Sequence, residues 1–396
     1  MRKYTISILL IISIFFVTSA EAMTKDEFIP KIFDALGYQI KVEKFSDTSD
    51  TITKSEAIRL LLEGMGWDFA ISAVESLYIL PDFSEKDLLK EMFQNITPAL
   101  PETILSHLDE AFTVEDLTPL REWIKKAQKN VSWKGIYHSK DTTLTIIKRG
   151  IGNPSGPANG DIKNGKNEPL YIASLSIPMA RINSQIATAV MIGSKKAPLS
   201  RIAEENYGVI GGINGGYFAG AKPIGILRRQ GHMDNNKFWP HRSAFGWNSK
   251  GEIVFVDGKE IGNISTTKGL DKYTEILQAG PLLIKNGEIS PNTENVHINI
   301  LDRRHPRTLV GYNKNRVIWC VIDGRDNMHS VGTTIEETKK LCLHMGMTEA
   351  LNLDGGGSSS LLWQGQTLTL PSNSNDAERP IPYAILFFQK GSGVRD

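Results

Sequence analysis

Residues 351–361 read LNLDGGGSSSL, and the rest of the chain is expected to be organised around this stretch. An apolar alternation ends at Asp354, and three glycines and three serines follow it. Three successive glycines lose much backbone entropy on folding, so they indicate a place where a side chain would block a ligand or where φ must be positive. A carboxylate before the glycines and hydroxyl groups after them suit an anionic or hydroxyl-rich ligand. A flexible Gly/Ser linker is the alternative, but the flanking ALNL and LLW are typical of buried strands.

The composition is that of an ordinary globular protein. The chain has 396 residues, of which 40% are hydrophobic and 22% charged, which is long enough for two domains. Its 45 lysines and arginines nearly balance 44 aspartates and glutamates, for a formal net charge of +1. This balance gives no reason to expect a nucleic acid or an acidic membrane surface as a partner.

The two cysteines do not form a disulfide framework. Cys320 lies in VIWCVI and Cys342 in KLCLHM, and both runs are apolar. Buried thiols are therefore expected, with a single bridge as the alternative if the chain is exported.

Residues 1–22 have the pattern of a signal peptide. Arg2 and Lys3 precede an apolar core at residues 6–17, and Ala20 and Ala22 are small residues at the positions that a signal peptidase reads. We expect cleavage after Ala22, giving a secreted or cell-wall associated protein with no later transmembrane span. An uncleaved anchor is the alternative, although the apolar run is short for crossing a bilayer.

Residues 23–130 have a helical pattern, which predicts a small all-α domain. Four hydroxyl residues each precede an acid by three positions, as in capping boxes: Thr24 with Glu27, Thr53 with Glu56, Ser84 with Asp87, and Thr113 with Asp116. Gly37 and Gly64 are predicted to end helices. The segment ITKSEAIRLLLEGMG at residues 52–66, with FSD upstream, resembles an S-layer homology repeat, a module that attaches proteins to cell-wall polymers. A plain helical spacer is the alternative.

Residues 131–396 change to short β-like runs separated by Gly, Asn and Pro turns. Two helices are predicted among them, one capped by Ser200 and one opened by Thr333 with Glu336 and ended by Gly346. Few helices among many strands predict an α+β (mixed α/β) domain rich in hairpins, rather than a doubly wound nucleotide fold. We expect this part to fold by itself.

Four polar clusters interrupt the strand patterns. The first begins at Asn214, the second contains Pro306 and Arg307, the third is Asp323-Gly324-Arg325, and the fourth is the Asp354 glycine run. Each cluster has a structural alternative, which is, in the same order, a simple turn, a solvated basic face, an ion pair and a linker. Their positions at strand ends nevertheless favour a shared cleft, because a strand gives its side chains fixed directions.

These clusters belong to a set of motifs that resembles the phosphodiester glycosidase family. The motifs, in order, are GGINGGYF, AGPLLIKNG, RHPRTLVG, VIDGR, NLDGGGSSSL and ERPIPYAI. The resemblance covers about residues 131–396. It implies hydrolysis of a sugar-1-phosphodiester between the anomeric carbon and oxygen, as in the N-acetylglucosamine-1-phosphodiester alpha-N-acetylglucosaminidase-like members and the bacterial members associated with exopolysaccharide. The sugar and the alcohol do not follow from it, since specificity is built in loops.

Roles for the residues follow from the chemistry of such a bond. A phosphomonoester leaves easily, so the reaction needs less proton donation than an ordinary glycosidase and more stabilisation of negative charge. Arginine pairs bidentately with phosphate, and backbone N–H groups add donors. Asp323 and Asp354 are the candidates for catalysis, but the sequence does not assign the two roles between them. The expected substrate-binding residues are Asn214, Gly215, His305, Arg307, Arg325, Gly355, Gly356, Gly357 and Ser358.

Other functions fit the sequence less well. A lipase-type serine nucleophile needs Gly-x-Ser-x-Gly, and Ser358 lacks the second glycine. Zinc is not indicated, because there is no HExxH or Cys/His set. No cofactor is expected, although Ca²⁺ or Mg²⁺ could use the oxygens of Asp323, Asp354 and Asn214. The alternative from another class is a non-catalytic cell-wall or polysaccharide-binding protein that keeps the fold.

Overall fold

The structure is a computed structural model that describes residues 22–37, 51–77, 88–153, 168–190, 195–263, 270–291, 294, 301–373 and 377–393. The expected signal segment, the FSD triplet and the pair Ser84 and Asp87 lie outside the described residues.

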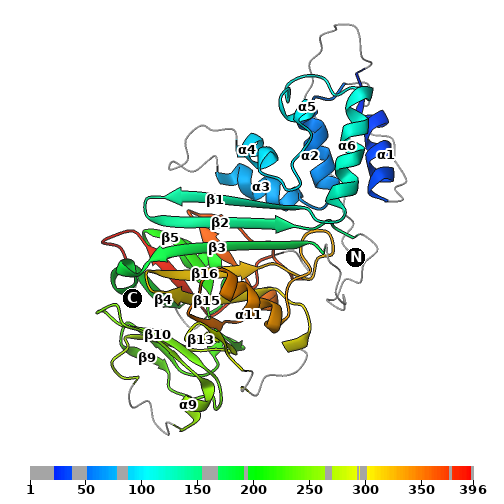
Figure 1. The fold of residues 1–396 in the computed structure, drawn as a ribbon. Helices are drawn as coiled ribbons and strands as arrows, with labels where there is room; N and C mark the ends of the chain where they lie inside the picture. Colours follow the sequence, from blue (N-terminus) through cyan, green and yellow to red (C-terminus); the bar gives the residue numbers. More distant parts are fainter. Residues whose placement is uncertain are drawn as a thin grey trace.

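The N-terminal part is helical, as the sequence predicts (Figure 1). Its helices are α1 (Lys25–Leu36), α2 (Lys54–Gly64), α3 (Asp68–Leu77), α4 (Leu88–Gln94), α5 (Glu102–Leu105) and α6 (Val114–Ala127). Thr53 and Thr113 form the predicted capping boxes. Gly37 follows α1 with φ +80°, as expected, but Gly64 lies inside α2. Gly66, with φ +78°, takes the left-handed conformation there instead.

The largest sheet has eight antiparallel strands in the order β1-β2-β3-β16-β15-β17-β13-β14. Their bounds are β1 Ser132–Ser139, β2 Thr142–Arg149, β3 Leu170–Pro178, β16 Arg316–Ile322, β15 Arg307–Asn313, β17 Glu349–Asn352, β13 Leu282–Lys285 and β14 Glu288–Ile289. One face contributes to the main core, which also contains the helical side chains. The other face packs against α11 (Ile335–His344). Cys320 and Cys342 are buried, free thiols in this second core.

Two further antiparallel sheets complete the strand-rich part (Figure 1). One is ordered β11-β10-β12-β8-β9 and the other β19-β18-β5-β20-β4, beside a β6-β7 hairpin. Their bounds are β4 Ile186–Val190, β5 Val209–Asn214, β6 Phe218–Ala219, β7 Lys222–Pro223, β8 Leu227–Arg229, β9 His232–Asn235, β10 Ala244–Trp247, β11 Ile253–Val256, β12 Glu275–Gln278, β18 Leu361–Trp363, β19 Gln366–Thr367 and β20 Tyr383–Phe388. The short helices are η1 Met179–Arg181, α7 Ile182–Gln185, α8 Leu199–Glu204, α9 Gly258–Asn263 and η2 Gly356–Ser358. This mixed architecture agrees with the predicted class.

Two predicted helix caps are wrong by one or two residues. The helix expected to start at Ser200 begins at Leu199, after Pro198, whose ring suits a helix entrance. The cap of α11 is Thr334 rather than Thr333. Thr334 exchanges hydrogen bonds with Glu337, whereas the backbone of Thr333 is paired with His305.

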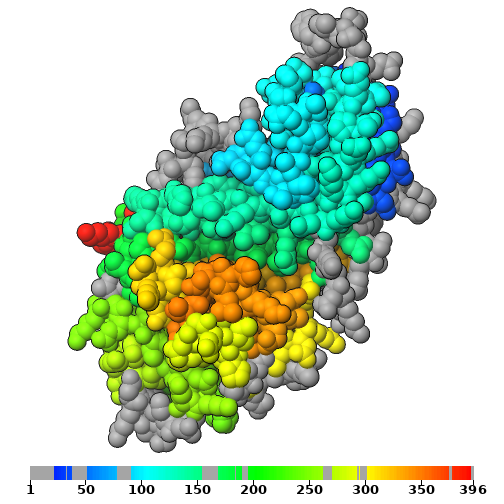
Figure 2. Space-filling view, in the orientation of Figure 1, coloured from blue at the N-terminus to red at the C-terminus, as the bar shows by residue number. Residues whose placement is uncertain are grey.

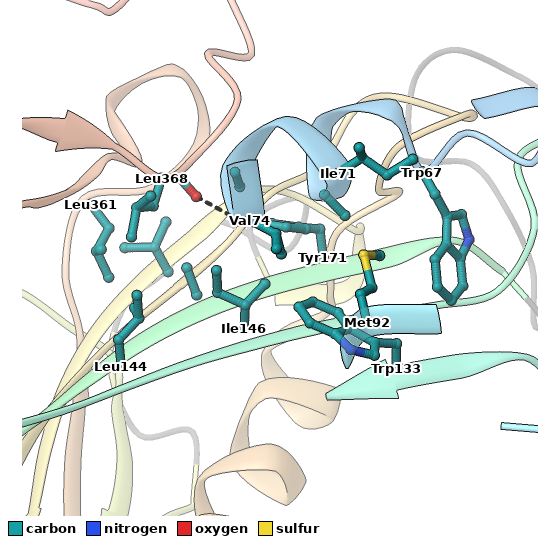
Figure 3. Packing of buried hydrophobic residues seen from close by; sticks show 14 of the residues in the cluster. Trp67, Ile71, Val74, Met92, Trp133, Leu144, Ile146, Tyr171, Leu361 and Leu368 are labelled. Atoms are coloured by element: carbon teal, nitrogen blue, oxygen red, sulfur yellow. Dashed lines mark hydrogen bonds between the residues drawn. The ribbon is translucent and has the colours of Figure 1, made fainter. Parts of the chain in front are cut away.

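The helical region shares its core with the large sheet. Trp67, Ile71 and Val74 pack near Ile146 and Tyr171 of the first strands (Figure 3). The indole N–H of Trp67 also donates to the Gly150 carbonyl at 2.8 Å. Figure 2 shows the helices lying against this edge of the sheet. A boundary between independent domains near residue 130 therefore stays a prediction.

Among the described residues, no helix has the length and apolar character needed to cross a bilayer.

A fragment of residues 131–396 is expected to fold with a lower melting temperature than the full chain. Without the N-terminal helices, the buried side chains of Trp133, Ile146 and Tyr171 would be exposed to water, and each such exposure costs about 1.5–3 kcal/mol. Calorimetry measures the melting temperature, and binding of the dye ANS measures the exposed apolar surface. A fragment that is as stable as the full chain and does not bind ANS would mean that the helices are an independent domain.

Candidate active site

The glycine run lies where three segments of chain meet. After β17, the N–H of Leu353 donates to Thr308 at 2.8 Å, and that of Asp354 donates to Gly215 at 3.3 Å. The N–H of Gly356 then donates to the Pro306 carbonyl at 2.9 Å. Three of the four predicted clusters are thereby brought together at one place.

Glycine is required in this run because other chain segments approach it closely. A Cβ on Gly355 would lie 2.8 Å from the carbonyl oxygen of Pro306, and one on Gly357 would overlap Oδ1 of Asn373. Gly356 has φ +61°, and its Cβ would lie 2.8 Å from a guanidinium nitrogen of Arg325. The linker alternative is therefore excluded, since a flexible linker does not need such contacts.

A cavity of about 320 Å³ opens beside the glycines. The residues that line it come from all four clusters and from the segment before β20. They are Tyr217, His305, Arg307, Arg325, Asn352, Asp354, Gly355, Gly356, Gly357, Asn373 and Arg379.

Three arginines give the cavity a positive potential. Arg307 starts β15 and is 2% exposed; its Nε donates to Thr333 O and its Nη2 to Arg303 O, both at 2.9 Å. Burial lowers the pKa of Arg307 to about 10, and Arg325 nearby also lowers it. The pKa of Arg325 is lowered by burial and by the charge of Arg379. Crowded cations of this kind favour a bound anion that can neutralise them.

His305 lies next to Arg325 at the rim of this group. The guanidinium Nη2 of Arg325 lies 3.4 Å from Nδ1 of His305. A guanidinium can only donate, so Nδ1 accepts and the proton of the neutral imidazole lies on Nε2.

Asp354 is the one carboxylate among the described residues that line the cavity. Burial raises the pKa of Asp354 to about 6, although the hydroxyl of Ser358 and the charges of Arg379 and Arg325 oppose this rise. A carboxyl group with this pKa is ionised at neutral pH and still a useful base.

Asn214, Gly215 and Ser358 lie behind the cavity wall rather than on it. The Asn214 amide is fully buried; its Nδ2 donates to the carbonyls of Gly215 at 3.0 Å and Asp354 at 2.8 Å. A Cβ on Gly215 would overlap the ring of Tyr383. Ser358 contacts Asp354 and accepts from Arg379 at 3.3 Å. These residues, expected to bind substrate, hold the residues that line the cavity.

The glycine run offers fewer N–H donors than expected. The N–H of Gly356 donates to Pro306, and that of Ser358 donates back to Gly355 at 3.2 Å. These two groups serve the loop itself, because a tight turn satisfies its own backbone polar groups.

Asp323 does not line the cavity. Its side chain is 2% exposed; its Oδ2 lies 2.8 Å from Nε2 of His329 and accepts from the N–H of Leu370, also at 2.8 Å. Burial raises its pKa well above the usual range. Asp323 and Asp354 therefore do not form a catalytic pair around one space. Asp323 instead fixes the start of the loop that leads to Asn373.

Four cavity residues were not selected from the sequence: Tyr217, Asn352, Asn373 and Arg379. Tyr217 and Arg379 lie inside the quoted motifs GGYF and ERPIP, so the signal was present, and Asn352 alternates with Asp354 along LNLD. Asn373 lies in a polar loop, and nothing in its local sequence marks it.

The suggested calcium or magnesium ligands are not assembled. Asn214 points its oxygen at Thr308, 2.7 Å away, and at the N–H of Ser360. Within the residues that the structure describes, no group of three or more His, Cys, Asp or Glu side chains is arranged to hold a metal ion.

Residues 207–388 match the phosphodiester glycosidase family model. The matched segment contains every residue that lines the cavity. It excludes the N-terminal helices and strands β1 to β3. No curated protein is similar enough in sequence to match the chain.

One solved structure shows a similar fold, and two others align with lower TM-scores. The catalytic domain of zebrafish N-acetylglucosamine-1-phosphodiester alpha-N-acetylglucosaminidase, auto-inhibited by its pro-peptide, aligns with a TM-score of 0.51 and 18% identity over 66% of this chain and 88% of that chain. A hypothetical protein from Synechocystis aligns with a TM-score of 0.47 and 14% identity, over 66% of this chain and 78% of that one. A Burkholderia pseudomallei protein aligns with a TM-score of 0.45 and 13% identity, over 59% and 76%.

Proposed function

We propose that the protein hydrolyses a sugar-1-phosphodiester at the bond between the anomeric carbon and oxygen, releasing the sugar and a phosphomonoester. The sugar is of the N-acetylglucosamine type or a unit of a cell-wall or exopolysaccharide glycan. The observation that carries this proposal is one cavity whose described lining contains three guanidinium groups and, as its one carboxylate, Asp354 with a pKa of about 6. The match to the phosphodiester glycosidase family model supports it.

The arginines would bind the phosphate that leaves. Arg307 is fixed by its two backbone carbonyl partners, so its guanidinium is pre-organised. Arg325 lies beside Gly356 and Arg379 beside Ser358, so both add charge next to the glycine run. Planar guanidinium groups match phosphate oxygens in pairs. As the C1–O bond breaks, its electron pair moves to the phosphate oxygen, and three cations stabilise the negative charge that develops there.

Asp354 would act in its ionised form. Water attacks C1, its proton passes to the Asp354 carboxylate, and the leaving phosphomonoester needs no proton from a second acid. The ionised carboxylate also stabilises the positive charge on the sugar ring in the transition state. A single carboxylate in the cavity is sufficient for this reaction, whereas an alkyl glycoside would need two. Asp323 is proposed as a positioning residue that acts through the Leu370 backbone.

Asp354→Asn is expected to abolish turnover, and the wild-type kcat/KM is expected to fall as the pH drops through about 6. Activity needs the ionised form of Asp354, so protonation below the raised pKa removes the base.

The stability of the fold depends on pH in the opposite direction. Because the folded pKa exceeds the unfolded value, Asp354 destabilises the folded state progressively as the pH rises through 6. The variant should therefore melt at the same or a higher temperature than wild type at pH 8, and the difference should vanish below pH 4. Near-normal turnover by a correctly folded variant would contradict the role.

Arg307→Lys and Arg325→Lys are each expected to lower kcat/KM on a sugar-1-phosphodiester by about 10-fold or more, because lysine lacks the planar two-point contact. Weak activity on an aryl glycoside of the same sugar, which has no phosphate, should change little. Arg201→Lys, at an exposed position in α8, is the matched control. Equal losses on both substrates would show that the arginines support the fold. Binding of the phosphodiester without any turnover by the wild type would favour the non-catalytic binding protein.

We further propose that the protein is secreted or cell-wall associated, with residues 1–22 as a signal peptide and the helical region of residues 23–130 as the wall-binding part. The capping boxes at Thr53 and Thr113 support the comparison with S-layer homology repeats only as far as the helix starts. Protein recovered from the culture should begin at Met23 by N-terminal sequencing. The full chain should sediment with purified cell wall, whereas residues 131–396 should not. Equal sedimentation of both would leave the helices as a spacer.

A further inference from the structure

A second cavity, about 650 Å³, adjoins the proposed active site. It lies among the β6-β7 hairpin, strands β8 and β9, and the segment that follows β9. The lining residues that matter for its chemistry are Lys195, Lys222, Lys237, Phe238, Trp239 and Pro382. We call this cavity the lysine groove.

The lysine groove and the active-site cavity share their dividing wall. Tyr217 lines the active-site cavity, and its ring meets Trp239 of the lysine groove edge to face, with centroids 5.9 Å apart. Arg242 lies over both rings, 4.2 Å from the Trp239 centroid and 5.3 Å from that of Tyr217. The two cavities therefore lie on either side of one aromatic pair.

A second segment also serves both cavities. Arg379 lines the active-site cavity, and Pro382, three residues later, lines the lysine groove. The guanidinium of Arg379 lies 5.8 Å from the ring of Phe218, at the base of the β6-β7 hairpin. The positive charge thus extends from the reaction site along this hairpin.

The groove is preformed rather than adaptable. Gln278 holds the segment at Trp239 by accepting from its N–H at 2.9 Å and donating to its carbonyl at 3.0 Å. Asn235 donates to the carbonyls of Pro223 and Gly225, both at 2.8 Å, which joins β9 to the hairpin. A fixed groove loses little entropy when a flexible chain binds in it.

The charge of the groove is positive. Lys195, Lys222 and Lys237 are exposed, and in the part of the chain that the structure describes no carboxylate lies within ion-pair distance of them. The acid of the groove, Asp234, is paired with Arg229 at 2.9 Å. Phe238, 37% exposed, and Trp239 add apolar ring surface of the kind that packs against the C–H faces of sugars or polyols.

We propose that the lysine groove binds the continuation of a polymeric substrate, namely a chain of sugar or polyol units joined by phosphodiesters, next to the bond that is cleaved. This inference rests on the proposed function. The lysines pair with successive phosphates, and the aromatic rings contact the units between them. The groove has about twice the volume of the active-site cavity, so it accepts more of the polymer than the reaction site does.

The test compares two synthetic substrates. One is N-acetylglucosamine-1-phosphate linked to glycerol, and the other is the same unit linked to a tri(glycerol phosphate) chain. Wild-type kcat/KM should be about 10-fold higher on the longer substrate, since three exposed ion pairs together give an effect of that size. The variant with Lys195→Gln, Lys222→Gln and Lys237→Gln should lose this preference and keep its rate on the short substrate within about twofold. Phe238→Ala should lose part of the preference without a change in charge.

A second triple variant is the matched control. Lys250→Gln, Lys259→Gln and Lys314→Gln remove the same charge from exposed positions outside both cavities. It should keep the preference for the longer substrate. No preference in the wild type, or equal loss in both triple variants, would overturn the inference. A neutral oligosaccharide or an oligothymidylate that binds as tightly as tri(glycerol phosphate) would also overturn it.

Calorimetric binding of tri(glycerol phosphate) separates this inference from the proposed function. If the protein hydrolyses neither substrate, the proposed function fails. Binding of tri(glycerol phosphate) that is lost in the groove variant and kept in the control would still support the groove as a binding site. Hydrolysis of the short substrate with no binding of the polymer overturns the groove alone.

Discussion

Asn214 makes the hydrogen bonds on which the rest of the site depends. Its Nδ2 donates to the backbone carbonyl of Asp354, and its Oδ1 accepts from Thr308 Oγ1 and from the N–H of Ser360. One buried amide thereby joins the end of β5, the start of β15 and both ends of the glycine run. A buried amide with its donors and acceptor satisfied is rigid, and breaking such a set is expensive. The position of Asp354 relative to Arg307 follows from this network.

The charged groups of the site are held under strain. Burial, together with a neighbouring guanidinium, lowers the pKa of Arg307 and of Arg325, and burial raises the pKa of Asp354. Each feature costs the folded protein free energy, and a bound anion would relieve the repulsion between the cations. This is typical of a site whose polar groups are arranged for a charged ligand rather than for the stability of the fold.

The sequence predicted the parts of the structure that depend on interactions between residues close together in the chain. Capping boxes at Thr53 and Thr113 were readable because both partners lie within one turn of helix. The glycine run pointed to a close approach, and the structure has one at Gly355. The directions in which side chains point were predicted less well from the sequence. Asn214 and Asp323 were both predicted to face the ligand, yet each turns to a partner from distant sequence, Thr308 and Leu370. Asn373 reaches the cavity only because the fold brings its loop against Gly357. No local pattern encodes such contacts.

The aromatic contact between Phe69 and His329 has a consequence for evolution. Phe69, in α3, packs edge to face against both Tyr171 and His329. Those two residues fix the loop that leads to the cavity: Tyr171 donates to Leu368 O, and His329 shares the Asp323 oxygen that accepts from Leu370. The helical region therefore supports one border of the cavity through a chain of direct contacts. Substitutions at Phe69 in related sequences should accordingly covary with changes at His329 and in the 368–373 loop, so that the two regions diverge together rather than as exchangeable modules.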